Sequence, residues 1–203
     1  MPSKFNTLPT TAYAEALTRS NFMDCGIKSL WQDMPRFSGP AYTVQLAAGD
    51  NLMLHAAIHE APAGSVIVVD GVDSDFAVAG GNVCAVAKKR GIAGFIIDGV
   101  IRDLAEIEEM KFPVFCRGVV PVPGGKKVIA PVIPKIDCGG ASVSAGDMVI
   151  ADEDGVVVLP VDKADDFFEI AKARFEKDAN TALDDWEADH KAKIMGIVEA
   201  AKK

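Results

Sequence analysis

The residues best suited to chemistry lie in the segment Gly94–Asp103, whose sequence is GFIIDGVIRD. An apolar stretch typical of a buried strand leads into a short turn, and Arg102 and Asp103 follow side by side. An arginine can grip a carboxylate through two parallel hydrogen bonds, and an adjacent aspartate can hold a hard divalent cation, Mg²⁺ or Mn²⁺. The same two residues also suit an ordinary surface ion pair, so their spacing alone leaves both interpretations open.

A second group of candidates, Gly80, Gly81, Asn82 and Val83, stands at the expected start of a helix. Glycines at this position let backbone N–H groups approach an anion closely, so we expect these residues to bind a substrate carboxylate. The alternative is a flexible loop in which Asn82 only caps the helix. The sequence lacks the GK[ST] of a P-loop and the GxGxxG of a dinucleotide site.

The two groups together are complementary to a 2-oxo acid. The N–H donors and Arg102 would hold its carboxylate, and a metal on Asp103 would withdraw charge from its ketone as an enolate forms. Aldol cleavage and oxaloacetate decarboxylation both need this stabilisation, and neither needs a Schiff-base lysine. We expect Lys88 and Lys89 to lie on a solvated helix surface.

Two further motifs are weaker candidates. His55 and His59 have i, i+4 spacing, but no HExxH pattern accompanies them, so packing or surface roles are expected. The basic segment Gly124–Lys127 is interpreted as the end of a hairpin, with attraction of an anionic substrate as the alternative.

Apolar periodicity predicts alternating strands and helices, which is the pattern of an α/β fold. Expected helices cover residues 10–31, 51–64, 80–90 and 104–110, and expected strands cover residues 41–46, 65–70, 94–99 and 113–116. The second half is expected to form a hairpin-rich β layer that faces the α/β half, with strands at 128–133, 141–143, 148–151 and 156–159. Residues 162–203 are expected to be helical, with a break near Asn180.

The composition excludes several classes of protein. The 203 residues suit a single domain, and a net charge of −8 argues against a nucleic-acid partner. No apolar run is long enough to span a membrane, and the N-terminus lacks the order of a signal peptide. Four cysteines lie far apart, so we expect free buried thiols in a reducing cytosol and hence a cytoplasmic protein with no membrane partner.

Several motifs occur in an order that resembles the RraA-like family, which includes 4-hydroxy-4-methyl-2-oxoglutarate / 4-carboxy-4-hydroxy-2-oxoadipate aldolases. They are GDNLMLHAA, VIVVDG, AKKRGIAGFIIDGVIRD, FPVFCRGVVP and CGGASVSAGDMVIADEDGVVVLP. The resemblance covers roughly residues 21–160. It implies an α/β/β sandwich of the swivelling-domain type with a C-terminal helical tail. It also implies a homotrimer or homohexamer with a divalent-metal site at its subunit interfaces.

The resemblance also implies roles for individual residues. Arg102 matches the arginine that contacts the pyruvyl group, Asp103 matches the metal-binding aspartate, and the N–H groups of residues 80–83 match the carboxylate cradle. In the aldolases, twenty residues separate Arg-Asp from an earlier aspartate that orients a proton-transferring water. Gly81 occupies that position here. Upstream, Asp73 or Asp75 could supply the missing carboxylate.

The aldolases further use a glutamate of the C-terminal helix, which reaches the water shell of the metal from a neighbouring subunit. Asp178 is the expected match, with Glu176 as its rival, and the tail 162–203 of this single domain would then pack on a neighbouring subunit. The expected function is a divalent-metal-dependent lyase acting on pyruvate-type 2-oxo acids, by aldol cleavage or oxaloacetate decarboxylation. The alternative is a non-catalytic binding protein that inhibits a ribonuclease, as the namesake of the family does.

Overall fold

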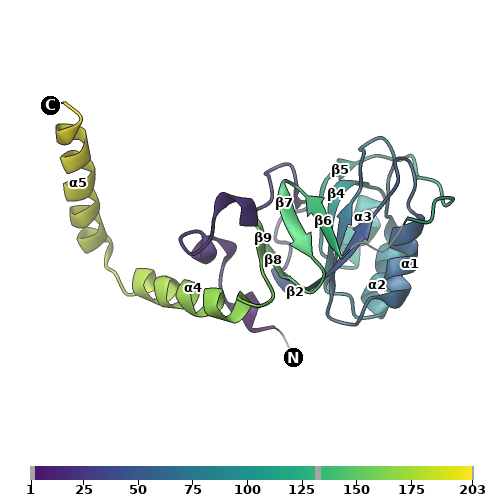
Figure 1. The fold of residues 1–203 in the computed structure, drawn as a ribbon, viewed down its shortest axis with the longest axis horizontal. Helices are drawn as coiled ribbons and strands as arrows, with labels where there is room; N and C mark the ends of the chain where they lie inside the picture. Colours follow the sequence, from purple (N-terminus) through teal and green to yellow (C-terminus); the bar gives the residue numbers. More distant parts are fainter. Residues whose placement is uncertain (1–2, 131–133, 203) are drawn as a thin grey trace.

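The computed structural model describes residues 3–130 and 134–202 of the chain (Figure 1). Its strands are β1 (Lys28–Ser29), β2 (Phe37–Gln45), β3 (Val66–Asp70), β4 (Gly94–Ile101), β5 (Val114–Val119), β6 (Lys135–Cys138), β7 (Ala141–Ser144), β8 (Met148–Asp152) and β9 (Gly155–Leu159). Its α-helices are α1 (Leu52–Glu60), α2 (Gly81–Lys89), α3 (Leu104–Glu109), α4 (Ala164–Ala179) and α5 (Leu183–Ala200). Three short 3₁₀ helices precede them, η1 (Lys4–Thr7), η2 (Thr10–Tyr13) and η3 (Arg19–Asn21).

Seven strands form one mixed sheet in the order β1-β5-β4-β3-β2-β8-β9. Strands β2 to β5 run parallel because α1, α2 and α3 connect them, whereas β8 joins β2 antiparallel and continues into the hairpin with β9. The sheet curls until its two edge strands, β1 and β9, touch, so it is almost closed. The hairpin β6–β7 packs on β2 and β3 as a further layer, which makes the α/β/β arrangement.

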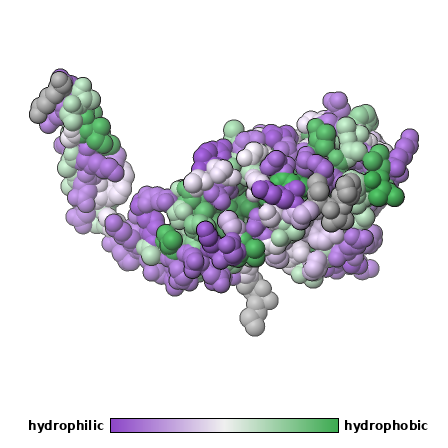
Figure 2. Space-filling view, viewed as in Figure 1, coloured by the Kyte–Doolittle hydropathy of each residue, from purple (hydrophilic) through white to green (hydrophobic). Residues whose placement is uncertain are grey.

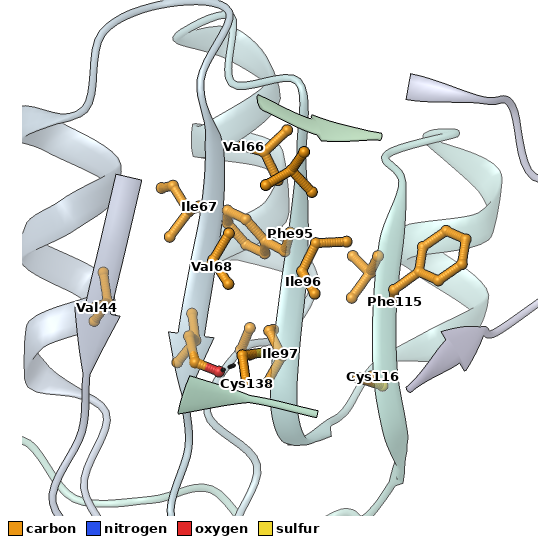
Figure 3. Packing of buried hydrophobic residues seen from close by; sticks show 14 of the residues in the cluster. Val44, Val66, Ile67, Val68, Phe95, Ile96, Ile97, Phe115, Cys116 and Cys138 are labelled. Atoms are coloured by element: carbon orange, nitrogen blue, oxygen red, sulfur yellow. Dashed lines mark hydrogen bonds between the residues drawn. The ribbon is translucent and has the colours of Figure 1, made fainter. Parts of the chain in front are cut away.

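The parallel strands form the centre of the main core (Figure 3). Residues 66–69 of β3 and 95–97 of β4 are completely buried, as their uninterrupted β-branched and aromatic sequence predicts for strands that are covered on both faces. The β6–β7 layer also contributes to this core, since the buried Cys138 thiol donates a 3.7 Å hydrogen bond to the Val69 carbonyl. The strands that carry the candidate site are therefore rigidly supported.

The prediction of a helical segment over residues 10–31 is wrong. Only the short helices η2 and η3 occur there, and the chain then runs irregularly into β1. Met23, Ile27, Trp31 and Met34 are spaced by three or four residues, as on a helix face, yet they reach the main core from the irregular chain on either side of β1. The apolar spacing therefore results from burial of these residues in the core and not from a helix.

The predicted strand 128–133 is also wrong in the part that the structure describes. Residues 128–130 are irregular, and Ile129 is 82% exposed. The N–H group of Val128 binds the Asp50 carboxylate rather than a neighbouring strand. Residues 131–133 of that prediction lie outside the described residues, and the actual strand is β6, which pairs with β7.

The predicted C-terminal tail is helical and breaks at Asn180, as expected. Helix α4 packs through Phe168 and Ala171 on a small second core formed by the N-terminal segment, β8 and β9. Helix α5 has no buried residue and stands away from the body of the molecule (Figure 1). None of the helices in the described part of the chain is long and apolar enough to cross a membrane.

Candidate functional site

The candidate site lies where β4 ends and α2 begins. The backbone N–H of Arg102, just beyond β4, donates to the Ala79 carbonyl at 3.0 Å, so the segment leading into α2 runs alongside the end of the strand. Gly80 is the N-cap of α2 and Gly81 is its first residue. This contact brings Arg102 and Asp103 to the N-terminus of α2, as the sequence predicted.

Asp103 has a left-handed backbone conformation, with φ 62° and ψ 40°. Aspartate tolerates this region better than most residues, but it remains uncommon outside glycine. The turn directs the carboxylate of Asp103 back to α2, where Oδ2 accepts a 3.0 Å hydrogen bond from the Gly81 N–H and lies 3.4 Å from Arg102 Nε. Oδ1 makes no hydrogen bond or ion pair within residues 3–130 and 134–202 and is available to a ligand.

Neighbouring side chains approach both glycines closely. A Cβ atom at Gly80 would lie 2.5 Å from Asp103 Oδ2 and 3.0 Å from Arg102 Cγ. A Cβ atom at Gly81 would lie 2.0 Å from Oε2 of Glu106, a residue of α3. The side-chain space at position 81 is therefore occupied by the Glu106 carboxylate, which the sequence interpretation did not consider.

The N–H groups of Asn82 and Val83 remain without a protein acceptor in the described part of the chain, as is usual for the first turn of a helix. They point to the same end of α2 as the Arg102 guanidinium, and both residues line a cleft of about 190 Å³. The helix dipole adds a partial positive charge there. The arrangement is thus suited to a small carboxylate.

The cleft has a second wall that the sequence interpretation did not assemble. Asn51, which is the N-cap of α1, His55 of α1 and Lys126 of the segment after β5 line the cleft together with Arg102 and Asp103. His55 was assigned to packing or to the surface, and Lys126 was only an alternative candidate for attracting an anion. The spacing of Asn51 and His55 on one face of α1 was the only sequence signal, and it did not show what that face meets.

Asp50 fixes the segment that carries Lys126. Its buried carboxylate accepts hydrogen bonds from the backbone N–H groups of Lys127 at 2.6 Å, Leu52 at 2.9 Å and Val128 at 3.3 Å. Burial alone would raise the pKa of Asp50, but these three donors outweigh it and hold the pKa below its ordinary value.

Other acidic candidates do not reach the cleft in the single chain. Asp73 accepts hydrogen bonds from the backbone N–H groups of Gly49 and Asp75, so its carboxylate holds a loop, and neither Asp73 nor Asp75 lines the cleft. Asp178 lies on α4, where it pairs with Arg174 at 2.7 Å, and Glu176 lies on the same helix. Whether a neighbouring subunit brings either acid to the site stays a prediction.

All four cysteines are free, as predicted, but Cys25 is exposed rather than buried. Cys84 lies in α2 near the site, where burial raises its pKa to about 12, with a smaller contribution from Asp103. A thiol with such a pKa remains protonated and does not act as a nucleophile at neutral pH.

A divalent cation fits this site only if water or substrate supplies most of its ligands. No group of three or more His, Cys, Asp and Glu residues that could hold a metal occurs in the described part of the chain. Mg²⁺ commonly takes one or two protein carboxylates and completes its shell with water and substrate. The free Oδ1 of Asp103 at the edge of the cleft is compatible with that mode of binding.

Comparison with known proteins identifies several relatives of this chain. The chain is 39% identical over 173 residues to a Halalkalibacterium halodurans protein named “Putative 4-hydroxy-4-methyl-2-oxoglutarate aldolase”, covering 85% of this chain and 82% of that one. The RNA-processing inhibitor RraA from Thermus thermophilis superposes with a TM-score of 0.68 at 28% identity, covering 75% of this chain and 92% of its own. A protein from Geobacillus kaustophilus called S-adenosylmethionine: 2-dimethylmenaquinone methyltransferase gives a TM-score of 0.69 at 33% identity, covering 75% and 94%. The model of the RraA-like family, Aldolase/RraA, matches residues 10–158, so the chain belongs to this family.

Proposed function

We propose that this protein is a divalent-metal-dependent lyase that cleaves or decarboxylates pyruvate-type 2-oxo acids. The observation that carries the proposal is the convergence of three groups at one cleft. These groups are the Arg102 guanidinium, the free Oδ1 of Asp103, and the unpaired N–H groups at the start of α2. The aldolase name of the Halalkalibacterium relative supports the same class of reaction.

The start of α2 and Arg102 would bind the substrate and stabilise the charge that develops on it. The N–H groups of Asn82 and Val83 bind the carboxylate of the 2-oxo acid, and the Arg102 guanidinium donates hydrogen bonds to its oxygens. As negative charge develops on the ketone oxygen, Arg102 stabilises it because guanidinium is always charged and needs no reorganisation. Arg102 is 42% exposed at its side chain and pairs with Asp103 only at 3.4 Å, so its donors are accessible to a substrate.

Asp103 would hold the cation, Mg²⁺ or Mn²⁺. When bound, a divalent cation acts as a Lewis acid that polarises the 2-oxo group. The hydrogen bond from Gly81 to Oδ2 orients the Asp103 carboxylate, so Oδ1 would be the oxygen that holds the cation.

We also propose that the protein works in the cytoplasm as a trimer or hexamer in which the C-terminal tail packs on a neighbouring subunit. Support comes from α5, which has no buried residue although Leu183, Trp186, Ile194 and Ile197 are apolar. Figure 2 shows this exposed apolar surface on α5. An exposed apolar helix surface of this kind is a common sign of an interface. In such an assembly Asp178, or Glu176, could complete the site of a neighbour.

The test is a lactate-dehydrogenase-coupled assay of pyruvate release from a panel of 2-oxo acids, with and without Mg²⁺. Oxaloacetate and 4-hydroxy-4-methyl-2-oxoglutarate should both be in the panel. We expect metal-stimulated turnover that Asp103→Ala abolishes and that Asp154→Ala, a matched change at an exposed aspartate in the β8–β9 turn, leaves unchanged. Absence of turnover with every 2-oxo acid in the presence of Mg²⁺ and Mn²⁺ would refute the proposal.

A second candidate function is inhibition of a ribonuclease by binding. Two observations favour it, the likeness to the RNA-processing inhibitor RraA and the glycine at position 81, where the resembling aldolases have an aspartate. An assay without turnover, combined with a measurable complex with a ribonuclease, would select this function. A methyltransferase is a poorer fit, because a cleft of about 190 Å³ is smaller than the roughly 300–1,000 Å³ usual for larger organic ligands.

A further inference from the structure

A second depression lies between the C-terminal ends of α1 and α2, at the other end of these helices from the candidate site. Its volume is about 710 Å³, and its polar lining consists of His59, Glu60, Lys89 and Arg90. The remaining lining residues are apolar, namely Ala61, Pro62, Ala63 and Val86. We call this depression the basic groove. In a protein with a net charge of −8, such a surface favours an acidic partner.

The positive charge of the basic groove is fixed and uncompensated. Neither Lys89 nor Arg90 forms an ion pair within residues 3–130 and 134–202. Arg90 is held in place because its Nη2 donates a hydrogen bond to the His59 carbonyl. Glu60 is directed to β2, where it accepts a 3.1 Å hydrogen bond from the Tyr42 hydroxyl. The exposed ammonium of Lys89 is therefore available to a carboxylate from outside the chain.

The first half of α5 carries the opposite charge. Residues 183–190 contain no lysine or arginine, and they contain four carboxylates, those of Asp184, Asp185, Glu187 and Asp189. All four are exposed, and none forms an ion pair in the described part of the chain. Unpaired charges of opposite sign on two surfaces make those surfaces electrostatically complementary.

An apolar stripe on α5 selects one of these carboxylates. The stripe recurs every three or four residues and contains Leu183, Trp186, His190, Ile194 and Ile197, with His190 stacked on Trp186. Residues four apart share a helix face, whereas residues two apart do not. Glu187 follows Leu183 by four positions and therefore lies beside the stripe, while Asp185 lies on the other side of the helix. A surface that covers the stripe also meets Glu187.

The spacing of the tail fits the basic groove and the candidate site together. On α1, His55 lines the cleft and His59, one turn further, lines the basic groove, and α2 likewise contributes to both. The two depressions therefore follow one strip of surface along helices of nine residues, about 13 Å in length. Trp186 follows Asp178 by eight residues, which is a comparable length of chain. A tail that brings Asp178 to the cleft of a neighbour can thus bring Trp186 to its basic groove.

The helix does not occupy the basic groove of its own chain. Figure 1 shows α5 at the opposite end of the molecule from α1 and α2. A helix of one copy in a groove of the next is a head-to-tail contact, and such contacts close into a ring when the rotation between copies permits. A trimer is a ring of this kind.

We propose that the basic groove of one subunit receives the first half of α5 from a neighbouring copy, with Glu187 paired to Lys89 and Trp186 packed on the apolar lining of the groove. This inference rests on the proposed function, because it takes the tail to pack on a neighbouring subunit. It adds the surface that receives the tail and the residues that recognise it.

Cross-linking tests the contact directly. A carbodiimide joins an amine to a carboxylate only where the two groups touch, and an assembly made from isotope-labelled and unlabelled subunits distinguishes links between chains from links within one. We expect a link between the Lys89 and Glu187 peptides that combines labelled with unlabelled chains. Links from α5 to other lysines without any to Lys89 would overturn the proposal.

Charge reversal tests the energetics. Sedimentation equilibrium gives the protein concentration at which half of the assembly has dissociated. Lys89→Glu and Glu187→Lys should each raise this concentration about tenfold or more, because each places like charges in contact, and the double variant should return it to within about threefold of wild type. If the assembly is too tight to dissociate, the cross-link still decides.

Two matched controls separate this contact from a general effect of charge. Lys88→Glu makes the same change on α2 at a residue that donates to the Met110 carbonyl on the α3 side, and Asp185→Lys makes it on the far side of α5. Both should stay within about twofold of wild type. Equal losses in Lys88→Glu and Lys89→Glu would overturn the docking of α5, as would an unchanged assembly in Lys89→Glu, and another occupant or surface would then hold the subunits together. A monomeric wild type would overturn both the docking and the proposed assembly, whereas pyruvate release tests the lyase function separately.

Discussion

Position 81 offers the sharpest test of the chemistry, because it is where this chain differs from the aldolases that it resembles. General acid–base help is worth about 10²–10⁴-fold in rate, or roughly 3–5 kcal/mol of barrier. Aldol cleavage needs a base to take the hydroxyl proton, whereas oxaloacetate decarboxylation does not, since CO₂ departs directly. We therefore predict that the wild-type protein decarboxylates oxaloacetate more readily than it cleaves 4-hydroxy-4-methyl-2-oxoglutarate.

The structure shows what a substitution at Gly81 would meet. The backbone there is an ordinary helix start without a positive φ, so any residue can adopt it. A new Cβ would lie 2.0 Å from Glu106 Oε2, but this is the end of an exposed, flexible side chain that can rotate away. Replacing a glycine by alanine in a helix raises the free energy of unfolding by up to roughly 0.5–1 kcal/mol. This gain in stability offsets the entropy lost when Glu106 is restricted to fewer rotamers. We expect Gly81→Ala to fold with a free energy of unfolding within about 1 kcal/mol of wild type.

Gly81→Asp places a third carboxylate beside Asp103 and Glu106. Repulsion among them raises the pKa of the new acid and limits its gain in aldol cleavage. We expect a larger increase in kcat for aldol cleavage when Gly81→Asp is combined with Glu106→Gln, which removes one charge and keeps the shape. Gly81→Ala should give no increase, and melting temperatures of all variants control for stability.

The assay is the ratio of aldolase to decarboxylase kcat, measured by pyruvate release with saturating Mg²⁺. A wild-type aldolase rate equal to or above the decarboxylase rate would refute the reasoning. A strong loss of aldol cleavage in Glu106→Gln alone would then show that Glu106 already supplies the carboxylate that Gly81 lacks. Asp73 is the poorer choice, because both of its oxygens accept hydrogen bonds from loop N–H groups.

Four further predictions follow from the site and the tail. Asp103→Ala should abolish metal-stimulated turnover while circular dichroism shows that the fold is retained, and its melting temperature should fall, because alanine suits the left-handed backbone less well and the Gly81 N–H loses its acceptor. Undiminished metal stimulation would contradict the assignment of Asp103 as the metal ligand. Arg102→Lys should lower mainly kcat, since a point charge cannot replace the planar fork, and wild-type values of kcat and KM would show that the residue is structural. The pKa of Asp50 is depressed in the folded state, so the stability that it contributes is fully present above its ordinary pKa of 3.8 and is lost as the pH falls through the lower pKa of the folded state. The difference in free energy of unfolding between wild type and Asp50→Asn should therefore shrink as the pH falls below 3.8. Light scattering should show a trimer or hexamer at micromolar concentration, and a stable monomer would contradict the proposed role of Asp178.

The strands and helices between residues 65 and 119 could be predicted, because the local sequence there favours the same structure that burial in the core requires. Strands β3 and β4 are short, β-branched runs, and Gly91, with a φ of +80°, ends α2 as expected of a glycine after a helix. The N-terminal segment misled the prediction because its apolar spacing reflects contacts with distant strands. Residues 128–130 misled it in the same way, since valine and isoleucine favour strands but here lie exposed beside the contacts of Asp50.

The candidate site was likewise predictable only where it depends on residues that are neighbours in the sequence. Arg102 and Asp103 are neighbours in the sequence and follow a recognisable strand, so their pairing was visible without a structure. The wall containing Asn51 and Lys126 depends on contacts such as that between Asp50 and the Lys127 N–H, which join residues 77 positions apart. No local pattern encodes such a contact.

Asp103 offers the proposed cation a single free carboxylate oxygen, Oδ1. A cation held by one protein oxygen is weakly bound unless the substrate itself provides further ligands, so metal and substrate affinity should be coupled. Affinity for Mg²⁺ should consequently rise when pyruvate is bound, and calorimetric titration with Mg²⁺ in the presence and absence of pyruvate measures this rise.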